Sequence, residues 1–304
     1  MILNAGIVTY NPELDRFNDN ISKLIMQFDK IMIFDNGSDN YPDIKKLCDN
    51  YSNTTLINGE KNYGIGYALN RIMEFFEKNK TEWVLLLDQD SIIPENLKCE
   101  YLKVIEIEKN VAIVCPSILD NNTKQEKSIK TPYEKIGICI TSGSMTNVSI
   151  WKSLGGFRED FFIDSVDNEY CIRLFFQDYS IIRCNNVCLN HELGKSKKHL
   201  IKTTTNHNET RRYYIARNST YVSYKYAPIL KKKIINKSER KKVDSFLDGL
   251  ICKKTNLRRQ IQFAVLIILY ENHKIKKLKS IVRGYFDGIK MYKKEKTIRC
   301  GGII

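Results

Sequence analysis

The feature that most constrains this chain is an apolar run that stops in two acids. The residues Trp83–Leu87 are all apolar, and Asp88-Gln89-Asp90-Ser91 follows directly. An apolar run bounded by polar residues is typical of a strand that is buried on both faces, as in a parallel sheet. Ligands bind beyond the carboxyl ends of strands in open α/β sheets, so the two acids lie where chemistry is expected.

Asp88 and Asp90 are two positions apart, so their side chains share one side of an extended segment and can face the same cavity. Two carboxylates in such a cleft suit Mg²⁺ or Mn²⁺, bound together with substrate phosphates. The same residues also fit an acidic turn in which Asp90 caps the next helix. This stretch alone does not decide between the two interpretations.

Apolar patterning elsewhere predicts strands that alternate with helices, which indicates an α/β fold with a doubly wound, mostly parallel sheet. Besides 83–87, we expect strands at 2–8, 31–34, 54–57, 111–115 and 180–189. The segment 137–146 is expected to hold a buried strand that is followed by Gly143. Helices are expected at 14–28, 68–76, 149–154, 168–176 and 207–226, with a further helix that starts at Pro94. Residues 121–132 are polar and predict a connecting loop or a small hairpin.

The charge of the 304-residue chain is unevenly placed. Residues 1–190 hold 20 Lys and Arg against 27 Asp and Glu, whereas residues 191–304 hold 29 against 8. The basic surplus therefore belongs to the C-terminal third, and the shift in composition indicates a boundary near residue 200.

The nine cysteines are odd in number and mostly lie in apolar runs, which predicts reduced thiols and a cytoplasmic protein. Cys184, Cys188 and His191 have a loosely zinc-like spacing, but a second pair of ligands is lacking. We expect no signal peptide, because Met1 runs straight into a predicted strand. The longest apolar run, Phe263–Tyr270, is too short to cross a membrane.

Three predicted strands end in polar residues that should meet at one edge of the sheet: Thr9-Tyr10-Asn11, Asp35-Asn36-Gly37-Ser38 and Asp88-Gln89-Asp90-Ser91. A glycine pair, Gly64-x-Gly66, follows the third strand. The pair lacks the third glycine of a dinucleotide fingerprint, so we interpret it as a tight turn into a helix that also faces the ligand.

Later motifs complete a pattern: Thr141-Ser142-Gly143-Ser144, Leu154-Gly155-Gly156-Phe157, Phe162-Ile163-Asp164 with Asp167, Glu169 and Arg173, and Arg217-Asn218. In their order and spacing, these motifs resemble those of inverting family-2 glycosyltransferases of the GT-A fold. Asp88-Gln89-Asp90-Ser91 is similar to the metal-binding turn of the bacterial rhamnosyltransferase branch. The resemblance covers residues 1 to about 225. It implies a GT-A domain over 1–226, followed by a basic helical region over 227–304.

The resemblance also implies a donor site and a metal site. The donor-binding residues would be Thr9, Tyr10, Asn11, Asp35, Asn36, Asn62, Gly64, Asn70, Asp88, Gln89 and Arg217. The ligands of Mg²⁺ or Mn²⁺ would be Asp90, Asp88 and His191. Asp35 would accept a hydrogen bond from a pyrimidine N3–H, although it also fits a turn aspartate before Asn-Gly. Asn70 equally fits a solvated or capping residue, and a lone histidine such as His191 is more often structural.

The catalytic base should lie at a helix that begins near Val166. Family enzymes usually carry Glu-Asp there, and this chain keeps only the second acid, Asp167, which we predict to be the base; Asp164 is the rival. An inverting transfer needs such a carboxylate to take the proton from the acceptor hydroxyl. The alternative is that Asp164 and Asp167 cap the helix, which does not explain a third acid at Glu169.

From residue 228 the pattern is of basic amphipathic helices, with lysine and arginine clusters at 231–233, 240–242 and 253–254. This suits an anionic membrane surface, although a soluble bundle with a basic face fits nearly as well, and the apolar residues could form a homodimer contact. We expect no nucleic-acid partner, because no recognition motif is present.

Together these features predict a cytoplasmic, membrane-peripheral transferase. The family resemblance implies dTDP-L-rhamnose as the first choice of donor, and a cell-surface or lipid-linked glycan as the acceptor. The alternatives are another donor such as a UDP-hexose, or a basic scaffold protein on a decayed transferase fold. The presence of Asp35, Asp90 and Asp167 favours an active enzyme.

Overall fold

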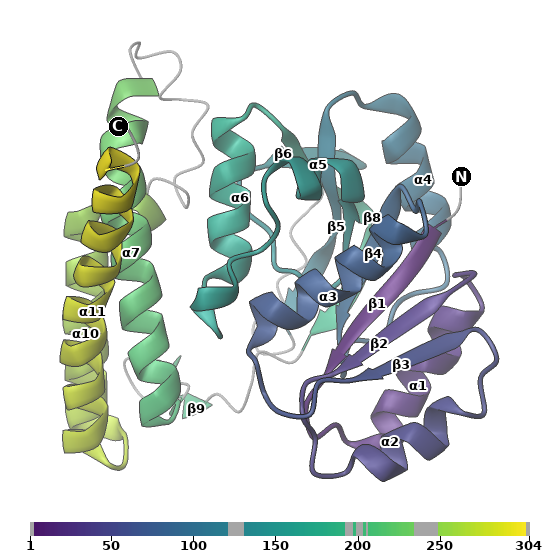
Figure 1. Ribbon diagram of the computed structural model, residues 1–304, viewed down its shortest axis with the longest axis horizontal. Helices are drawn as coiled ribbons and strands as arrows, with labels where there is room; N and C mark the ends of the chain where they lie inside the picture. Colours follow the sequence, from purple (N-terminus) through teal and green to yellow (C-terminus); the bar gives the residue numbers. More distant parts are fainter. Residues whose placement is uncertain are drawn as a thin grey trace. The chain divides into compact units, whose positions relative to one another are not determined.

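A computed structural model describes residues 3–120, 131–191, 197–198, 203–204, 206–233 and 249–301. The chain divides into two compact units (Figure 1). The first comprises Met1–Phe162 and Val166–Glu192, and the second comprises Ile163–Ser165 and Leu193–Ile304. The boundary at 226 that the sequence analysis gave lies within a helix, α7 (Glu209–Lys233), and it stays a prediction.

The first unit is built on an eight-stranded sheet with the order β3-β2-β1-β4-β7-β5-β8-β6. The strands are β1 (Leu3–Thr9), β2 (Ile31–Asp35), β3 (Thr54–Asn58), β4 (Trp83–Asp88), β5 (Val111–Asp120), β6 (Tyr133–Ile136), β7 (Ser144–Asn147) and β8 (Ser180–His191). Strands β3, β2, β1 and β4 are parallel neighbours, whereas β7 pairs antiparallel with both β4 and β5. The predicted α/β architecture with a mostly parallel sheet is therefore confirmed.

The helices of this unit are α1 (Leu14–Ile25), α2 (Tyr41–Cys48), α3 (Ile65–Lys78), α4 (Leu97–Ile107), α5 (Val148–Ser153) and α6 (Val166–Phe176), with a 3₁₀ turn η1 (Glu159–Phe161). Helices α1, α2 and α4 share one apolar core with alternate residues of β1, β2 and β4, as the period of two in a strand requires. Helix α3 packs on β1 and β2, where Gly6 leaves room for Ile72.

Two expectations for local structure were wrong. Helix α4 begins at Leu97 and not at Pro94, because Pro94 accepts a hydrogen bond from the Leu97 amide (3.2 Å) and so closes a turn. The buried strand expected before Gly143 in the segment 137–146 is not formed, and β7 begins after this glycine, at Ser144. The chain first turns at Gly143, whose φ of 81° is a left-handed conformation that glycine adopts readily. Helix α2 was not foreseen.

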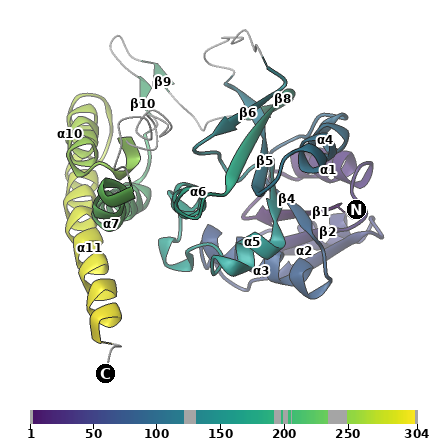
Figure 2. The same cartoon turned by 90° about the horizontal axis from the view of Figure 1, so that it is seen from above.

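The described part of the second unit contains three long helices, α7, α10 (Lys253–Tyr270) and α11 (Lys274–Gly301), and a small hairpin of β9 (Lys197–Lys198) and β10 (Thr203–Thr204). Figure 2 shows α10 and α11 alongside α7. Gly284 and Gly288 of α11 lie against the α7 backbone, where a Cβ atom would come within 2.4 Å of the main-chain oxygens of Tyr213 and Arg217. The helical C-terminal region is confirmed.

Charged side chains are buried inside this helical unit. Glu271 is bonded to both Arg212 and Lys277, and all three side chains are nearly inaccessible to solvent. Among the described residues, no helix is both long enough and apolar enough to cross a membrane.

Candidate active site

The carboxyl ends of β1, β2 and β4 lie side by side. Thr9 is paired in register with Asp35, and Val8 with Asp88, so the three polar strand ends of the sequence meet at one edge as expected. Two hydrogen bonds join the ends of the strands directly: the Tyr10 amide donates to Gln89 Oε1 (2.7 Å), and the Asn36 amide donates to the Thr9 carbonyl (2.7 Å).

Asp35 is the hydrogen-bonding centre of this edge. Its Oδ1 accepts from the hydroxyls of Thr9 (3.0 Å) and Ser38 (2.5 Å), and its Oδ2 accepts from the amides of Gly37 (3.2 Å) and Ser38 (2.9 Å). A carboxylate offers about four acceptor sites, so the protein itself fills them all. Asp35 is also completely buried. Asp35 therefore orders the loop that follows β2. A direct hydrogen bond from a nucleotide base to Asp35 would require the hydroxyl of Thr9 or Ser38 to turn away.

Asn11 and Asn36 extend the same network. Asn11 has a left-handed φ of 49°, and its side chain accepts from the Asp39 amide (2.8 Å). Asn36 donates to Asn62 Oδ1 (3.2 Å) and accepts from the Tyr63 amide (2.9 Å), which ties the end of β2 to the turn before α3. These two side chains and Asn62 therefore shape the loops beside the strand ends.

The turn after β4 is held from both sides. Asn20 donates to the Asp88 carbonyl (3.0 Å), and Arg16 donates to the Asp90 carbonyl (2.8 Å), so these bonds from α1 use main-chain oxygens. On the other side the Asp88 amide donates to Ser142 Oγ (3.2 Å), and Ser142 Oγ lies 2.7 Å from Ser91 Oγ. The backbone of the two acids is thus fixed, and both residues are half-exposed.

A divalent metal fits this turn in part. Within the described part of the chain, no group of three His, Cys, Asp or Glu side chains is arranged to hold a metal ion. Asp88 and Asp90 supply two hard oxygen donors, which suits a cation that takes its other ligands from phosphate oxygens and water. His191 ends β8 opposite Asp120, but its side chain lies outside the described residues.

Asn70 and Gly64 have structural roles that the sequence analysis did not foresee. The Asn70 amide donates to Phe157 O (2.9 Å) and Glu159 Oε1 (2.9 Å), and accepts from the Phe157 amide (2.8 Å) and Trp151 Nε1 (3.2 Å). These four bonds use the full capacity of the side chain, so none is left for the predicted donor contact.

A Cβ on Gly64 would lie 2.6 Å from the Phe162 backbone, and one on Gly66 would lie 2.3 Å from Arg158 O. The glycine pair therefore allows α3 to approach the 158–162 segment closely.

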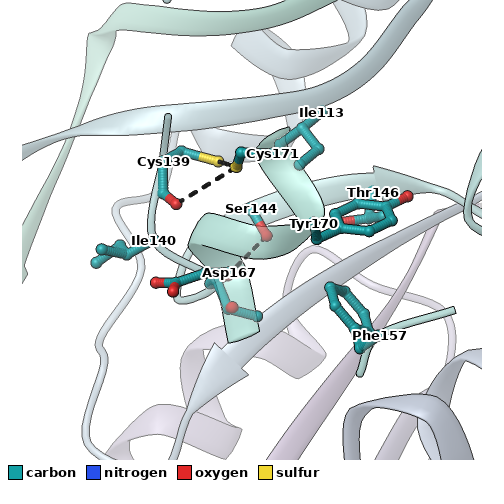
Figure 3. Close-up of a pocket in the computed structure, with 10 residues that line it drawn as sticks. Ile113, Cys139, Ile140, Ser144, Thr146, Phe157, Asp167, Tyr170 and Cys171 are labelled. Atoms are coloured by element: carbon teal, nitrogen blue, oxygen red, sulfur yellow. Dashed lines mark hydrogen bonds between the residues drawn. The ribbon is translucent and has the colours of Figure 1, made fainter. Parts of the chain in front are cut away.

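The predicted base, Asp167, lies in the first turn of α6, half-exposed, with its Oδ1 accepting from the Asn168 amide (2.7 Å). It lines a small cavity of about 10 Å³ together with residues of α6, β5, β7 and the 139–141 segment (Figure 3). A cavity of this size holds about one water molecule. The 141–144 segment contributes Thr141 and Ser144 to this cavity and Ser142 to the Asp88 turn, so it connects the predicted base to the acidic turn.

Three thiols line or flank the inner side of this cavity. Cys139 Sγ lies 3.9 Å from Cys171 Sγ, and Cys115 is close to Cys139. Hydrogen bonds from its two neighbours and burial raise the pKa of Cys139 well above its usual value. Burial likewise raises the pKa of Tyr170 far above that of an exposed tyrosine. Cys139 and Tyr170 therefore stay neutral, and Asp167 supplies the carboxyl group among the residues that line the cavity.

The third acid of the motif, Glu169, has a structural role. It is fully buried and pairs with Arg173 (2.8 Å), which also donates to the carbonyls of Leu154 (2.6 Å) and Gly156 (2.6 Å). This ion pair attaches the loop that contains Gly155 and Gly156 to α6. It gives Glu169 a role that helix capping does not.

Asp164 and Arg217 belong to the second unit. Asp164 pairs with Arg211 (3.1 Å), and the main-chain oxygens of Ile163 and Asp164 accept from Asn218. Asp164 and Ser165 both have positive φ, of 64° and 65°, a conformation that costs energy for residues other than glycine and is held here by Asn218. Arg217 lies over the Tyr214 ring, 4.7 Å from its centroid, and donates to Asn218 (2.9 Å).

The sequence analysis missed Asn20, Arg16 and Ser38 as supports of the site. A usable signal existed for Asn20, which is a polar residue on the otherwise apolar face of α1 that contains Phe17, Ile21 and Leu24. A polar group in a core needs a partner, and here the partner is the turn after β4. The zinc-like spacing has no counterpart among the described residues, since Cys184 is buried in the apolar core.

The chain is similar to known proteins in both sequence and structure. It is 28% identical over 248 residues to the dTDP-rhamnosyl transferase RfbF of Shigella flexneri, an alignment that covers 74% of this chain and 81% of that one. A solved structure of TarS from S. aureus with UDP-GlcNAc has a TM-score of 0.55 at 14% identity, covering 95% of this chain and 81% of that chain.

The mannosyltransferase of Pyrobaculum calidifontis with GDP-Man and Mn²⁺ has a TM-score of 0.55 at 14% identity, covering 94% and 86%. These structural likenesses show that the fold is that of GT-A glycosyltransferases. The model of glycosyl transferase family 2 matches residues 5–172, and the chain therefore belongs to that family.

Proposed function

We propose that this chain transfers L-rhamnose from dTDP-L-rhamnose to a hydroxyl of a cell-surface or lipid-linked glycan, with inversion at the sugar. The observation that carries the proposal is the link between Asp167 and the acidic turn: the 141–144 segment touches both, and it does so in a family-2 fold. The sugar is proposed from the relative that is named a dTDP-rhamnosyl transferase.

Donor binding falls to the strand ends. Thr9, Tyr10 and Asn11 would line the nucleotide pocket, and Asp35 would keep its wall ordered through the Ser38 loop. Gln89 holds the Tyr10 amide, which fixes the first strand end against the acidic turn. Asn36 and Asn62 would shape the side of the pocket next to α3.

Asp88 and Asp90 would hold Mg²⁺ or Mn²⁺, and His191 is a candidate third ligand. When bound, the ion neutralises charge on the departing diphosphate. Arg16 and Asn20 keep the turn in place by binding its carbonyls, which leaves the geometry of the two acids fixed before the donor arrives. Relatives in fold have been solved with Mn²⁺, which supports a divalent ion without deciding between the two metals.

Asp167 would act as the general base. It would accept the proton of the acceptor hydroxyl while that oxygen attacks the anomeric carbon and the nucleotide diphosphate leaves. The first turn of α6 fixes its position, and Glu169 with Arg173 secures the helix. Asp164 is engaged with Arg211, so Asp167 is preferred.

We further propose that the enzyme works on the cytoplasmic side of an anionic membrane. Its described cysteines are free thiols, as a reducing compartment requires. A lipid-linked acceptor would be presented at that surface.

The base preference of the pocket can be measured with nucleotides alone. Titration calorimetry in the presence of Mg²⁺ or Mn²⁺ should show tighter binding of dTDP and UDP than of GDP and ADP, because the Asp35 carboxylate can accept a hydrogen bond from a pyrimidine N3–H once the Thr9 or Ser38 hydroxyl turns away. Tighter binding of GDP would refute the pyrimidine pocket.

A further inference from the structure

Helix α10 buries polar side chains next to an apolar one. Its buried side carries Asn256 and Gln260, which are 1% and 4% exposed, together with Ile267. Asn256 donates to Thr220 Oγ1 (3.1 Å), and Gln260 donates to Ser219 Oγ (3.1 Å), so polar side chains fasten α10 to α7. A helix that buries amides in this way has its apolar residues left for another surface.

Those apolar residues form a stripe along the outside of α10. The exposed members are Leu257, Ile261, Val265, Ile268 and Leu269. Their spacing of three and four residues keeps them on one face for three turns. Ile261 is 56% exposed and Ile268 is 51% exposed, which is unusual for isoleucine in a folded protein.

Helix α11 adds a second stripe. Gly284 and Gly288 face α7, so the opposite side of α11 points outward. That side carries Ile275, Val282 and Phe286, which are 71%, 56% and 57% exposed. Lysines and an arginine are interspersed with them, namely Lys276, Lys279, Arg283, Lys290 and Lys293. We call the two stripes together the outer face of α10–α11.

The charge of the outer face is of one sign. The acids between Lys253 and Gly301 are Glu271, Asp287 and Glu295. Glu271 is buried with Arg212 and Lys277, and Glu295 bonds to Tyr221 and Lys225 of α7. Asp287 is bonded to Tyr213 of α7 (3.0 Å) and also pairs with the exposed cations Arg283 (3.6 Å) and Lys290 (3.5 Å). Each of the three acids thus bonds to a residue of α7, and the exposed cations outnumber the acids beside the apolar side chains.

We propose that the outer face of α10–α11 docks on an anionic lipid surface, with the apolar stripe at the acyl boundary and the cations at the headgroups. Apolar residues flanked by Lys and Arg are the pattern that binds such surfaces. A second copy of the chain is a poor occupant, because stacking two such faces brings cation against cation. These residues would hold the proposed transferase near a lipid-linked acceptor. Only this last point rests on the proposed function; lipid binding itself does not.

The test uses the full chain and vesicles without donor or acceptor, so its result is independent of the enzymatic reaction. We expect co-sedimentation with vesicles of phosphatidylcholine and phosphatidylglycerol, and little with phosphatidylcholine alone. Each basic residue near an anionic surface contributes roughly a fivefold factor in binding, so binding should fall steeply as salt rises.

Two double variants separate the electrostatic contribution to lipid binding from the apolar one. Lys279→Glu with Lys293→Glu should weaken binding to anionic vesicles by roughly tenfold or more. Ile261→Ser with Ile268→Ser should weaken it by about tenfold or more at every salt concentration, because apolar burial is not screened. The matched controls are Lys46→Glu with Lys109→Glu and the single change Ile107→Ser, at exposed positions of the first unit, and neither should alter binding.

Circular dichroism and thermal melting should show that the variants fold, since all the altered side chains are exposed. Equal binding to neutral vesicles, or a full chain that stays in the supernatant at low salt, would overturn the proposal. So would a concentration-dependent dimer in analytical ultracentrifugation that Ile261→Ser with Ile268→Ser abolishes, because a second copy would then cover the face.

Discussion

Asp167→Asn is expected to lower turnover by a factor of roughly 10²–10⁴ while the affinity for the nucleotide donor stays nearly unchanged, because a general base acts only on the acceptor proton. Asparagine keeps the size of the side chain and its bond from the Asn168 amide through Oδ1, so the first turn of α6 should persist. The measurement is steady-state turnover together with calorimetric donor affinity for each variant.

Asp178→Asn provides the matched control for this change. Asp178 lies just beyond the other end of α6 and has a φ of 59°, a conformation that asparagine also adopts readily. The Asp178→Asn substitution removes one negative charge, as Asp167→Asn does, and should leave turnover near the wild-type value. If Asp167→Asn kept wild-type turnover while Asp164→Asn lost it, the base would be Asp164.

Asp90→Asn should reduce metal-dependent turnover by a factor on the order of 10² or more, since one of two carboxylate ligands is lost and charge on the leaving diphosphate is then poorly neutralised. The concentration of Mg²⁺ or Mn²⁺ that gives half-maximal activity should also rise. A metal titration of turnover measures both effects, and a titration of metal-dependent nucleotide binding measures the second effect without catalysis.

Glu95→Gln serves as the control for Asp90→Asn. Its side chain is 92% exposed and lies 3.8 Å from Lys23, so its charge is screened by solvent. It should not shift the metal titration. A shift as large as that of Asp90→Asn would mean that the metal responds to the general charge of the region and is not bound at the acidic turn.

The sheet and its active edge were predictable from sequence because their signals are local. An apolar run such as Trp83–Leu87 identifies a buried strand, and parallel strands bring their polar ends together whatever the loops do. The expected meeting of the Thr9, Asp35 and Asp88 ends follows from that rule alone. The strand predicted before Gly143 was wrong because Cys139 and Ile140 line a cavity, and the segment joins the sheet only from Ser144 onwards.

The roles of Asn70 and Asp35 were beyond sequence reasoning because their partners decide them. Asn70 bonds to Phe157, which is 87 positions away, and no local pattern predicts such a contact. The partners of Asp35 are closer in sequence. Its carboxylate has no free acceptor site, however, only because Thr9, Gly37 and Ser38 all donate to it. In both cases the sequence identified a polar residue of interest, and only the folded structure showed which polar groups hydrogen-bond to it.

The C-terminal third illustrates a different limit. Its composition gave helices and a basic surplus, but not which side of each helix is buried. That Asn256 and Gln260 lie inside while Ile261 and Ile268 lie outside depends on the polar face that α7 presents to α10. An apolar stripe in a helix would ordinarily be assigned to the core.

The account is tested most directly by turnover of a panel of donors. The full-length chain should release nucleotide from dTDP-L-rhamnose faster than from UDP-glucose, UDP-galactose or GDP-mannose. The release should require Mg²⁺ or Mn²⁺ and should be abolished by chelation. Fastest release from GDP-mannose would contradict the proposed donor. The absence of both turnover and nucleotide binding across the whole panel would contradict the enzyme itself and indicate a binding protein on a transferase fold.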